Sequence, residues 1–332
     1  MSETPAYPQT RHEPAFPDGF VSSPYEPPFV PAAPPRRFQG RLWVHLLLLG
    51  VTLLFTTAVG ALHYDSFLSN FDRAPVDLTS GALALRGLWY SVTLLAILGA
   101  HEMGHYLCCR YYDVDASMPY FIPAPIPLTG TLGAVIRIRE AFPTRTVLFD
   151  IGIAGPIAGF VVLVPALFIG MLMSHVVPEP TQGAGFVLGE PLLFQWATRA
   201  VLGVVPDGYT VNIHPIVFAA WFGMLATALN LLPFSQLDGG HVTYATMGRA
   251  ATPISIVTVT AAVVMTFVSR SWLAMTLLML AMLFFLGPRH PRVIYEYEPL
   301  APGRRLLAVF ALVMFVLCFT PVPLEPLQFV GR

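Results

Sequence analysis

Long uncharged runs dominate the hydrophobic pattern of this chain. The first, Trp43–Leu62, has 20 residues, which is enough for a helix to cross the hydrocarbon core of a bilayer. Later runs of the same character are separated by polar connections, and we interpret them as spans two to seven: Gly87–Tyr111, Val147–Met173, Pro215–Leu232, Ala251–Val268, Ser271–Gly287 and Leu306–Leu324. The pattern predicts an all-α polytopic membrane protein with about seven transmembrane helices, the number after residue 240 being open.

One segment between the second and third spans departs from the helical pattern. Pro119–Pro127 contains four prolines, which remove backbone donors and clash with a preceding helical turn. Gly130–Arg139 then ends in alternating apolar and polar residues, as expected for a turn followed by a strand. Non-helical backbone at membrane depth needs a protein or water lining. We therefore expect a re-entrant loop or β-hairpin near the active site, with an ordinary surface loop as the alternative.

Composition supports the membrane class and limits the possible partners. The chain is 55% hydrophobic and 11% charged, whereas soluble domains have about 25% charged residues. The lipid bilayer is thus an expected partner. A net charge of −1 without a basic run gives no indication of nucleic-acid binding. Residues 1–40 hold ten prolines without periodicity, so we expect a disordered cytoplasmic tail there, followed by a transmembrane domain over 41–332.

The arginines predict the orientation. With seven spans, the tail and the connections 110–146, 233–250 and 288–305 lie on one side of the membrane. Apart from Arg11, which is far from the first span in sequence, that side holds twelve arginines against five on the other, so we expect it to be cytoplasmic. The twelve are Arg36, Arg37, Arg41, Arg110, Arg137, Arg139, Arg145, Arg249, Arg289, Arg292, Arg304 and Arg305, and the five are Arg73, Arg86, Arg199, Arg270 and Arg332.

Candidate chemistry lies near the end of the second span, in the motif His101-Glu102-Met103-Gly104-His105. On a helix the two histidines lie one turn apart on the same face and can hold one zinc ion, with Glu102 beside it as general base. A chance match is expected in on the order of one in a hundred such chains. An unused ionisable cluster inside an apolar span would be costly, which favours a metal site.

A third ligand is expected from the end of the fourth span. Asp238 precedes two glycines, follows the span that ends at Pro233, and falls on the same predicted side of the membrane as His101. Alone, an Asp-Gly pair would indicate only a turn. Asn230, in the last turns of the same helix, is placed to hydrogen-bond the oxyanion of a tetrahedral intermediate.

Other ionisable residues are weaker candidates. His241 is either a support for the ligands or merely interfacial. Asp150 is explained by the dipole of the helix that it opens. Neither the number nor the spacing of Cys108, Cys109 and Cys318 suggests a disulfide framework or a second zinc site.

The two motifs, HExxH at 101–105 and NxxPxxxLDGG at 230–240, resemble the signatures of the site-2 protease family of intramembrane zinc metalloproteases. The resemblance covers about Tyr90–Gly240, with Ser235 where many members have a second proline. It implies one Zn²⁺ per chain held by His101, His105 and Asp238, with Glu102 as base and Asn230 assisting. The connection 174–213 is too short for an inserted PDZ domain, so we expect a minimal, bacterial or plastid-like member without PDZ or CBS modules.

This resemblance implies hydrolysis of peptide bonds within the transmembrane helices of single-span substrate proteins, as in regulated intramembrane proteolysis. We expect a bacterial inner membrane location with the active site toward the cytoplasm. A membrane metal-ion transporter and a catalytically silent membrane scaffold are the alternatives. The substrate, the upstream signal or first protease, the oligomeric state and the role of the tail are open.

Overall fold

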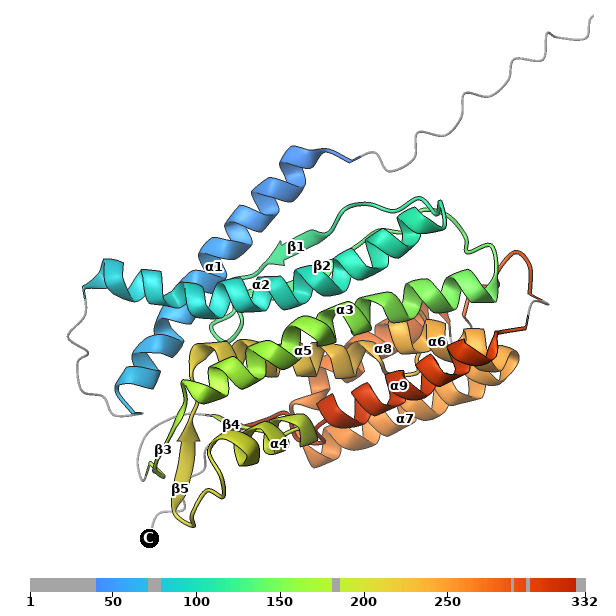
Figure 1. Cartoon of the computed structure of the whole chain (residues 1–332). Helices are drawn as coiled ribbons and strands as arrows, with labels where there is room; N and C mark the ends of the chain where they lie inside the picture. The colour runs from blue at the N-terminus through green and yellow to red at the C-terminus, as the bar shows by residue number, and fades with distance from the viewer. Residues whose placement is uncertain (1–39, 71–78, 181–185, 288–289, 297–298, 327–332) are drawn as a thin grey trace, which may run out of the picture. The chain divides into compact units, whose positions relative to one another are not determined.

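The computed structural model describes residues 40–70, 79–180, 186–287, 290–296 and 299–326. These residues form nine α-helices, α1 Leu42–Leu68, α2 Ser80–Tyr111, α3 Arg145–Leu172, α4 Leu192–Val201, α5 Pro215–Asn230, α6 Asp238–Met247, α7 Ala251–Val268, α8 Trp272–Leu286 and α9 Pro302–Cys318 (Figure 1). They also form three antiparallel strand pairs, β1 Tyr120–Pro123 with β2 Thr131–Val135, β3 His175–Pro178 with β5 Tyr209–Asn212, and β4 Phe186–Leu188 with β6 Leu324–Pro326.

Four helical stretches are long and apolar enough to cross a membrane. They are α1, α2, α3 and the stretch Asp238–Val268, in which α6 leads into α7 through a short 3-10 turn. Helices α5 and α8 are shorter apolar helices, and α9 has 17 residues. The protein is therefore mainly helical and polytopic, as the hydrophobic pattern predicts, while seven spans remain a prediction.

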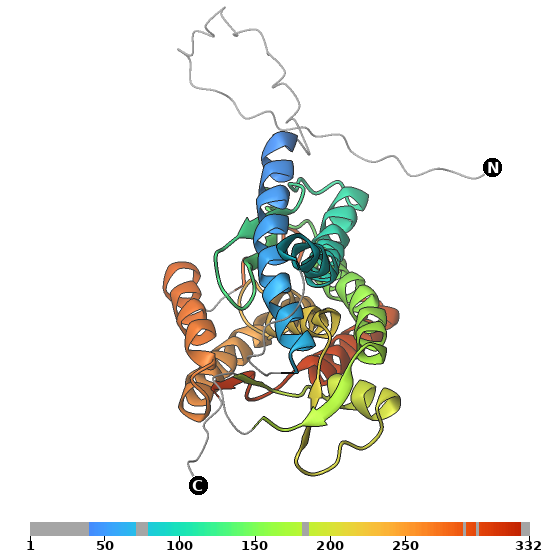
Figure 2. The same ribbon diagram turned by 90° about the vertical axis from the view of Figure 1, so that its left-hand side faces the viewer.

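Helices α1 and α2 cross at two glycines whose lack of a side chain permits the contact. A Cβ atom on Gly60 would lie 2.3 Å from the carbonyl oxygen of Gly87, and one on Gly87 would lie 2.2 Å from that of Thr57. The hydroxyl groups of Thr57 and Ser91 are hydrogen-bonded at 2.9 Å beside this crossing. Small residues thus set the α1–α2 distance, as is common in membrane helix pairs (Figure 2).

Helix α3 lies between α2 and α5 and carries much of the core (Figure 1). Its residues Leu163 and Leu167 are fully buried against Trp221 and Met224 of α5. Burying an aliphatic or aromatic side chain of this size stabilises the packing by about 1.5–3 kcal/mol in water; between lipid-embedded helices, van der Waals contact supplies the attraction. This packing fixes α2 and α5, which carry the candidate site residues, relative to each other.

The predicted hairpin between the second and third spans is present as β1 and β2, with Phe121 paired to Ala134. The turn of the hairpin lies beside α1 and α2: Gly130 packs against the backbone of Phe55, and the Tyr90 hydroxyl donates to the Thr129 carbonyl at 3.0 Å. Tyr90 lies about 30 Å before the end of α2 at Tyr111, at 1.5 Å per residue. The hairpin therefore extends back beside the two helices, and its entry into a bilayer remains a prediction.

The connection 174–213 contains more structure than its sequence predicts. The sequence pattern of Pro191–Val204 predicts a short amphipathic helix, which is present as α4, whereas strands β3, β4 and β5 were not predicted. Each has three or four residues, too few for a recognisable period, and β4 pairs with β6 near the far end of the chain. Such pairings are set by tertiary contacts rather than by local pattern.

The interpretation of Asp150 as a helix-dipole residue was incomplete. Arg304 of α9 donates through Nε and Nη2 to its two carboxylate oxygens, at 2.8 and 2.7 Å, and the Tyr112 hydroxyl also donates to it. Burial, together with the Asp150 carboxylate, raises the pKa of Tyr112 to about 12. The carboxylate thus joins the end of α2, the start of α3 and the start of α9.

Three arginine-rich connections meet at this same end of the helices. Arg145 pairs with Glu296 at 3.5 Å, and Thr144 forms a β-bridge with Tyr295. Gly248, at the end of α6, lies next to the Arg145 guanidinium. This arrangement agrees with placing these connections on one side of a membrane. The predicted tail at 1–40, except for Gly40, lies outside the described residues, as do Arg36, Arg37, Arg73, Arg289 and Arg332 of the arginine count.

Candidate metal centre

The HExxH motif lies on the buried face of α2. Helical spacing brings the two imidazoles together, and the Nε2 atoms of His101 and His105 are 3.2 Å apart. Both residues are buried, at 7% and 6% exposure. Nδ1 of His105 lies 2.7 Å from the carbonyl oxygen of Ile151 on α3, so it carries the proton and donates. Nε2 of His105 therefore carries a free lone pair, which faces Nε2 of His101. A histidine that binds a metal through Nε2 requires this tautomer.

Asp238 reaches the same point from the other side of the core. Its carboxylate oxygens lie 3.1 Å from Nε2 of His101 and 3.3 Å from Nε2 of His105. The chain gets there by a turn after α5 in which Ser235 has a φ of 43°, followed immediately by α6. The structure therefore brings together His101, His105 and Asp238, three residues that the sequence singled out.

Asp238 is the first residue of helix α6, whereas its Asp-Gly pair taken alone would indicate a turn. The two following glycines permit close approach of the backbone: a Cβ on Gly239 would lie 2.0 Å from the Leu231 carbonyl oxygen, and one on Gly240 would lie 2.3 Å from that of Ser235. Glycine weakens a helix by about 1 kcal/mol relative to alanine, so the sequence alone favoured a turn. Packing against the α5–α6 turn outweighs that preference.

These three residues fit a metal ion. A tetrahedral zinc with bonds of about 2.0–2.1 Å has its ligands about 3.3 Å apart, and the observed separations are 3.1–3.3 Å. Oδ2 of Asp238 is buried without a hydrogen-bond donor. Two imidazole lone pairs and a carboxylate facing one another repel unless a proton or a cation lies between them. Two histidines and a carboxylate are a common ligand set of catalytic zinc sites.

Helix α3 shapes the space around the two imidazoles. A Cβ on Gly155 would lie 2.1 Å from Nε2 of His105, and one on Gly159 would lie 3.2 Å from Cβ of His101. From the sequence alone, the small residues of Ala154–Gly159 indicate only close packing between helices. The glycines of this segment instead face the candidate ligands, four residues apart like the histidines themselves, and that matched spacing was the clue in the sequence.

Replacing Gly155 with alanine should displace the His105 ring and weaken zinc binding by about 10–100-fold, the range found when residues that orient metal ligands are lost. Zinc measured in the purified protein after dialysis checks this. Gly50→Ala on α1 is the matched control, because nothing lies within 4 Å of its added Cβ. Wild-type zinc affinity in Gly155→Ala would show that α3 does not constrain the site.

The two remaining candidate residues also lie close to this cluster. The Asn230 side-chain amide, at the end of α5, is 3.3 Å from Nε2 of His101. Glu102 is 7% exposed, and its carboxylate accepts a hydrogen bond from the backbone N–H of Ile136, just after β2. This link between Glu102 and the hairpin was not predicted, because it uses backbone atoms that leave no trace in the sequence.

His241 does not join the cluster. Nδ1 of His241 lies 2.6 Å from Nε2 of His290, which precedes α9. Among the described residues, the only group of three or more His, Cys, Asp or Glu placed to hold a metal is His101, His105 and Asp238. His290 had no candidate role in the sequence analysis, yet it contacts the helix that begins at Asp238.

Comparison with known families decides the assignment. The model of peptidase family M50 matches residues 89–274, which is more than half of the chain and runs from within α2, before the HExxH motif, to the start of α8. The chain belongs to peptidase family M50. The resemblance to site-2 proteases drawn from the two motifs is thereby confirmed.

Several curated relatives of this M50 protein are plant proteins. It is 31% identical over 215 residues to the probable zinc metalloprotease EGY2, chloroplastic, of Oryza sativa subsp. indica, covering 62% of this chain and 37% of the relative. It is 38% identical over 165 residues to EGY1 of Arabidopsis thaliana, covering 48% and 29%. With EGY2 of Arabidopsis thaliana it shares 29% identity over 297 residues, covering 86% and 49%.

The chain thus spans at most about half the length of these relatives. Their names place them in the chloroplast, so they give no support to the expected bacterial inner membrane. No solved structure matches the chain.

Proposed function

We propose that this M50 protein is an intramembrane zinc metalloprotease that hydrolyses peptide bonds within the transmembrane helices of single-span substrates. The observation that carries the proposal is the convergence of His101, His105 and Asp238 at 3.1–3.3 Å, inside a bundle of apolar helices and next to Glu102. The names of the relatives, probable zinc metalloproteases, support the choice of metal.

A zinc ion held there would supply a Lewis acid that acidifies water and polarises a peptide carbonyl. Glu102 takes the proton of the attacking water and later delivers it to the leaving amine. The Asn230 amide donates a hydrogen bond to the oxyanion that develops on the carbonyl. The Ile151 carbonyl holds His105 in the tautomer whose Nε2 is free to bind.

The two alternatives are less consistent with the site. A metal transporter needs ligands along a path through the membrane, and the described residues contain a single group of this kind. A silent scaffold has no requirement for a general base beside the ligands, whereas Glu102 is present and buried. Neither observation favours transport or a purely structural role.

A cleavage assay separates these functions. The purified chain in vesicles should cut a generic single-span protein that has helix-weakening residues. Cleavage should stop after a chelator removes zinc and should recover when zinc is returned. Zinc flux should not exceed that of empty vesicles. Zinc flux without cleavage would support the transporter and contradict this proposal.

We also infer that the substrate is held at the free edge of β2. A transmembrane helix must be unwound before cleavage, which leaves backbone groups unpaired at several kcal/mol each in lipid. Strand β2 pairs only with β1 among the described strands, and its residues Leu132 and Val135 are 68% and 47% exposed. The backbone N–H of Ile136 contacts Glu102, so a strand paired beyond Val135 would run past the base.

Proline at this edge tests the inference. Ile136→Pro removes the N–H that contacts Glu102 and should reduce cleavage by at least about tenfold, the equivalent of one lost charged hydrogen bond. Ala134→Pro, within β2, should also reduce it. Zinc content should stay unchanged, and Ile136→Val, which keeps the N–H, should behave as wild type. Full cleavage by both proline variants would rule out strand pairing while leaving the zinc chemistry intact.

The topology that we propose has seven spans, with α5, α8 and α9 as the three shorter or more polar ones, and a hairpin that enters the membrane. The position of its turn beside Tyr90 supports that entry. The meeting of the arginine-rich connections at one end supports an active site that opens on the arginine-rich side. We further propose that residues 1–40 form a tail separate from the membrane domain at 41–332.

A further inference from the structure

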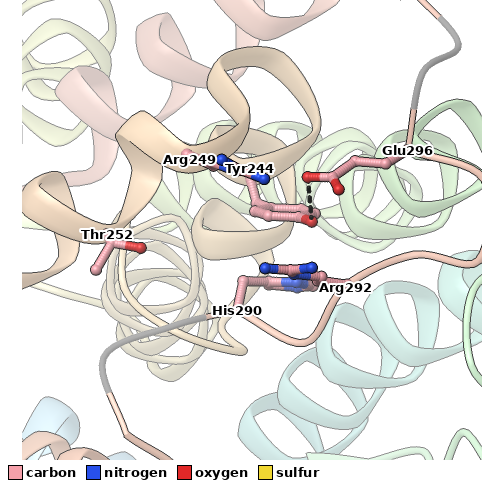
Figure 3. A pocket seen from close by; sticks show the side chains of 6 residues that line it. All are labelled: Tyr244, Arg249, Thr252, His290, Arg292 and Glu296. Carbon is pink, nitrogen blue, oxygen red and sulfur yellow. Dashed lines mark hydrogen bonds between the residues drawn. The ribbon is translucent and has the colours of Figure 1, made fainter.

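A cavity of about 390 Å³ lies between α6, the start of α7 and the connection before α9, outside the candidate metal centre. Its lining side chains are labelled in Figure 3: Tyr244, Arg249, Thr252, His290, Arg292 and Glu296. The volume falls at the lower end of the range for small-ligand sites, about 300–1,000 Å³. The cavity therefore has room for a small ligand or for the head of a larger one.

Positive charge exceeds negative charge around this cavity. Arg249 and Arg292 line it, and neither forms an ion pair or hydrogen bond through its side chain with another described residue. A third guanidinium, that of Arg145, lies 5.9 Å from the centre of the Tyr244 ring. Glu296 is the only acid in the lining, and its contacts are long, 3.5 Å to Arg145 and 3.4 Å to the Tyr244 hydroxyl.

Tyr244 forms the central part of the cavity wall. Its ring stacks on that of His290, with centroids 4.5 Å apart and an angle of 15° (Figure 3). Burial lowers the pKa of His290 below its usual range, so this imidazole is neutral at pH 7. Gly248 makes room for Arg145, because a Cβ there would lie 2.8 Å from Nη2 of the arginine. The lining residues Arg249, Arg292 and Glu296 therefore leave one positive charge uncompensated, and the nearby Arg145 raises this excess to two.

The cavity also adjoins an exposed apolar surface. Thr252 lies one helical turn before Ile256 on α7, and residues four apart share a helix face. Ile256 is 50% exposed, on a helix long and apolar enough to cross a membrane. In the segment before α9, Ile294 and Tyr295 are 62% and 67% exposed. In the seven-span topology proposed above, these positions correspond to the level of the lipid headgroups.

We propose that this cavity binds a phosphate group, with Arg249 and Arg292 as its ligands and the Thr252 hydroxyl as a further donor. Guanidinium groups bind phosphate oxygens in paired, charge-assisted hydrogen bonds, and a phosphodiester or phosphomonoester brings one to two negative charges. The phosphate is supplied by an anionic phospholipid or by a soluble phosphate. Because Tyr244 lies on the helix that begins at Asp238, an occupied cavity fastens the segment 290–296 to that helix.

Lipid retention by the full chain tests the site. Wild-type protein in nanodiscs of phosphatidylcholine mixed with phosphatidylglycerol should retain phosphatidylglycerol at least about tenfold better than Arg249→Gln/Arg292→Gln, as measured by native mass spectrometry. Phosphatidylcholine should be retained equally by both proteins. Arg305→Gln is the matched control, since this arginine is exposed on the same side and does not line the cavity.

A calorimetric titration of the detergent-solubilised protein with inorganic phosphate distinguishes the two sources. Binding of phosphate that the double variant loses would assign the site to soluble phosphates; retention of phosphatidylglycerol without phosphate binding would assign it to the lipid. Both results support the proposal. Equal retention of phosphatidylglycerol and equal phosphate binding by wild type and double variant would overturn it. A loss of binding in Arg305→Gln as large as the loss in the double variant would also overturn it. The single variants Arg249→Gln and Arg292→Gln give the same comparison should the double variant fail to fold.

Discussion

Replacing Glu102 with glutamine should reduce cleavage of a single-span substrate by at least about 100-fold, because general bases contribute about 10²–10⁴-fold to such reactions. Glutamine has nearly the shape of glutamate and can still occupy the space beside Ile136. It cannot accept the proton of the attacking water. Since His101, His105 and Asp238 are untouched, zinc should remain at about one ion per chain. Cleavage rate and zinc content are measured on the same preparation.

Glu190→Gln is the control for this substitution, since Glu190 is exposed and far from the motif in sequence. It should cleave at the wild-type rate. Wild-type cleavage by Glu102→Gln would mean that another group accepts the proton, and the hydrolytic mechanism described above would be wrong. Loss of both zinc and cleavage would instead assign Glu102 a role in holding the metal.

Removing any one ligand should have a different effect, a loss of the metal itself. His101→Ala, His105→Ala and Asp238→Ala should each weaken zinc binding by more than about 100-fold. Loss of a residue that only orients a ligand weakens metal binding by up to about 100-fold, and loss of the ligand itself should cost more. Each remaining cluster has two of the three ligands that a catalytic site requires. Cleavage should fall with zinc content in all three variants, and metal analysis after dialysis gives the measurement.

His175→Ala provides the control, because this exposed histidine interacts with Asn70 and Phe67 and not with the cluster. It should keep its zinc. Among the ligand variants, Asp238→Ala is the most informative, since the two histidines alone could retain some metal. Full zinc retention by Asp238→Ala would exclude that carboxylate from the coordination sphere and require another third ligand.

The parts of the fold that the sequence predicts best are those with a strong local pattern. Helix α7 has the predicted bounds, and α3 differs from its predicted span by a few residues. Helix α9 begins earlier than predicted, at Pro302, because Arg304 and Arg305 interrupt the uncharged run on which the prediction rests. A proline in the first turn is a normal helix start, and Arg304 is neutralised by Asp150 on α3.

The candidate site was predictable as far as it depends on motif spacing. Two histidines one turn apart require no tertiary information to be placed together. The same is not true of the backbone links, such as the Ile151 carbonyl to His105 or the N–H of Ile136 to Glu102. Every residue has these groups, so nothing in the sequence marks the ones that are used.

Helix α6 illustrates the remaining limit. Its first residues, Asp238-Gly239-Gly240, have low helix propensity, and local rules favour a turn. The helix forms because those glycines pack against carbonyl groups of the α5–α6 turn, a contact that exists only in the folded chain. The arginine-lined cavity beside Tyr244 also depends on this helix, and it could not have been inferred from the separate sequence segments that line it.

The most direct test of the zinc centre is X-ray absorption at the zinc edge of the purified wild-type protein. We expect a first shell of nitrogen and oxygen atoms at about 2.0–2.2 Å, from the two imidazoles, a carboxylate and a further light atom. Asp238→Ala should lose part of that shell. A sulfur shell at about 2.3 Å would place the metal on Cys108, Cys109 or Cys318 and would contradict the proposed centre.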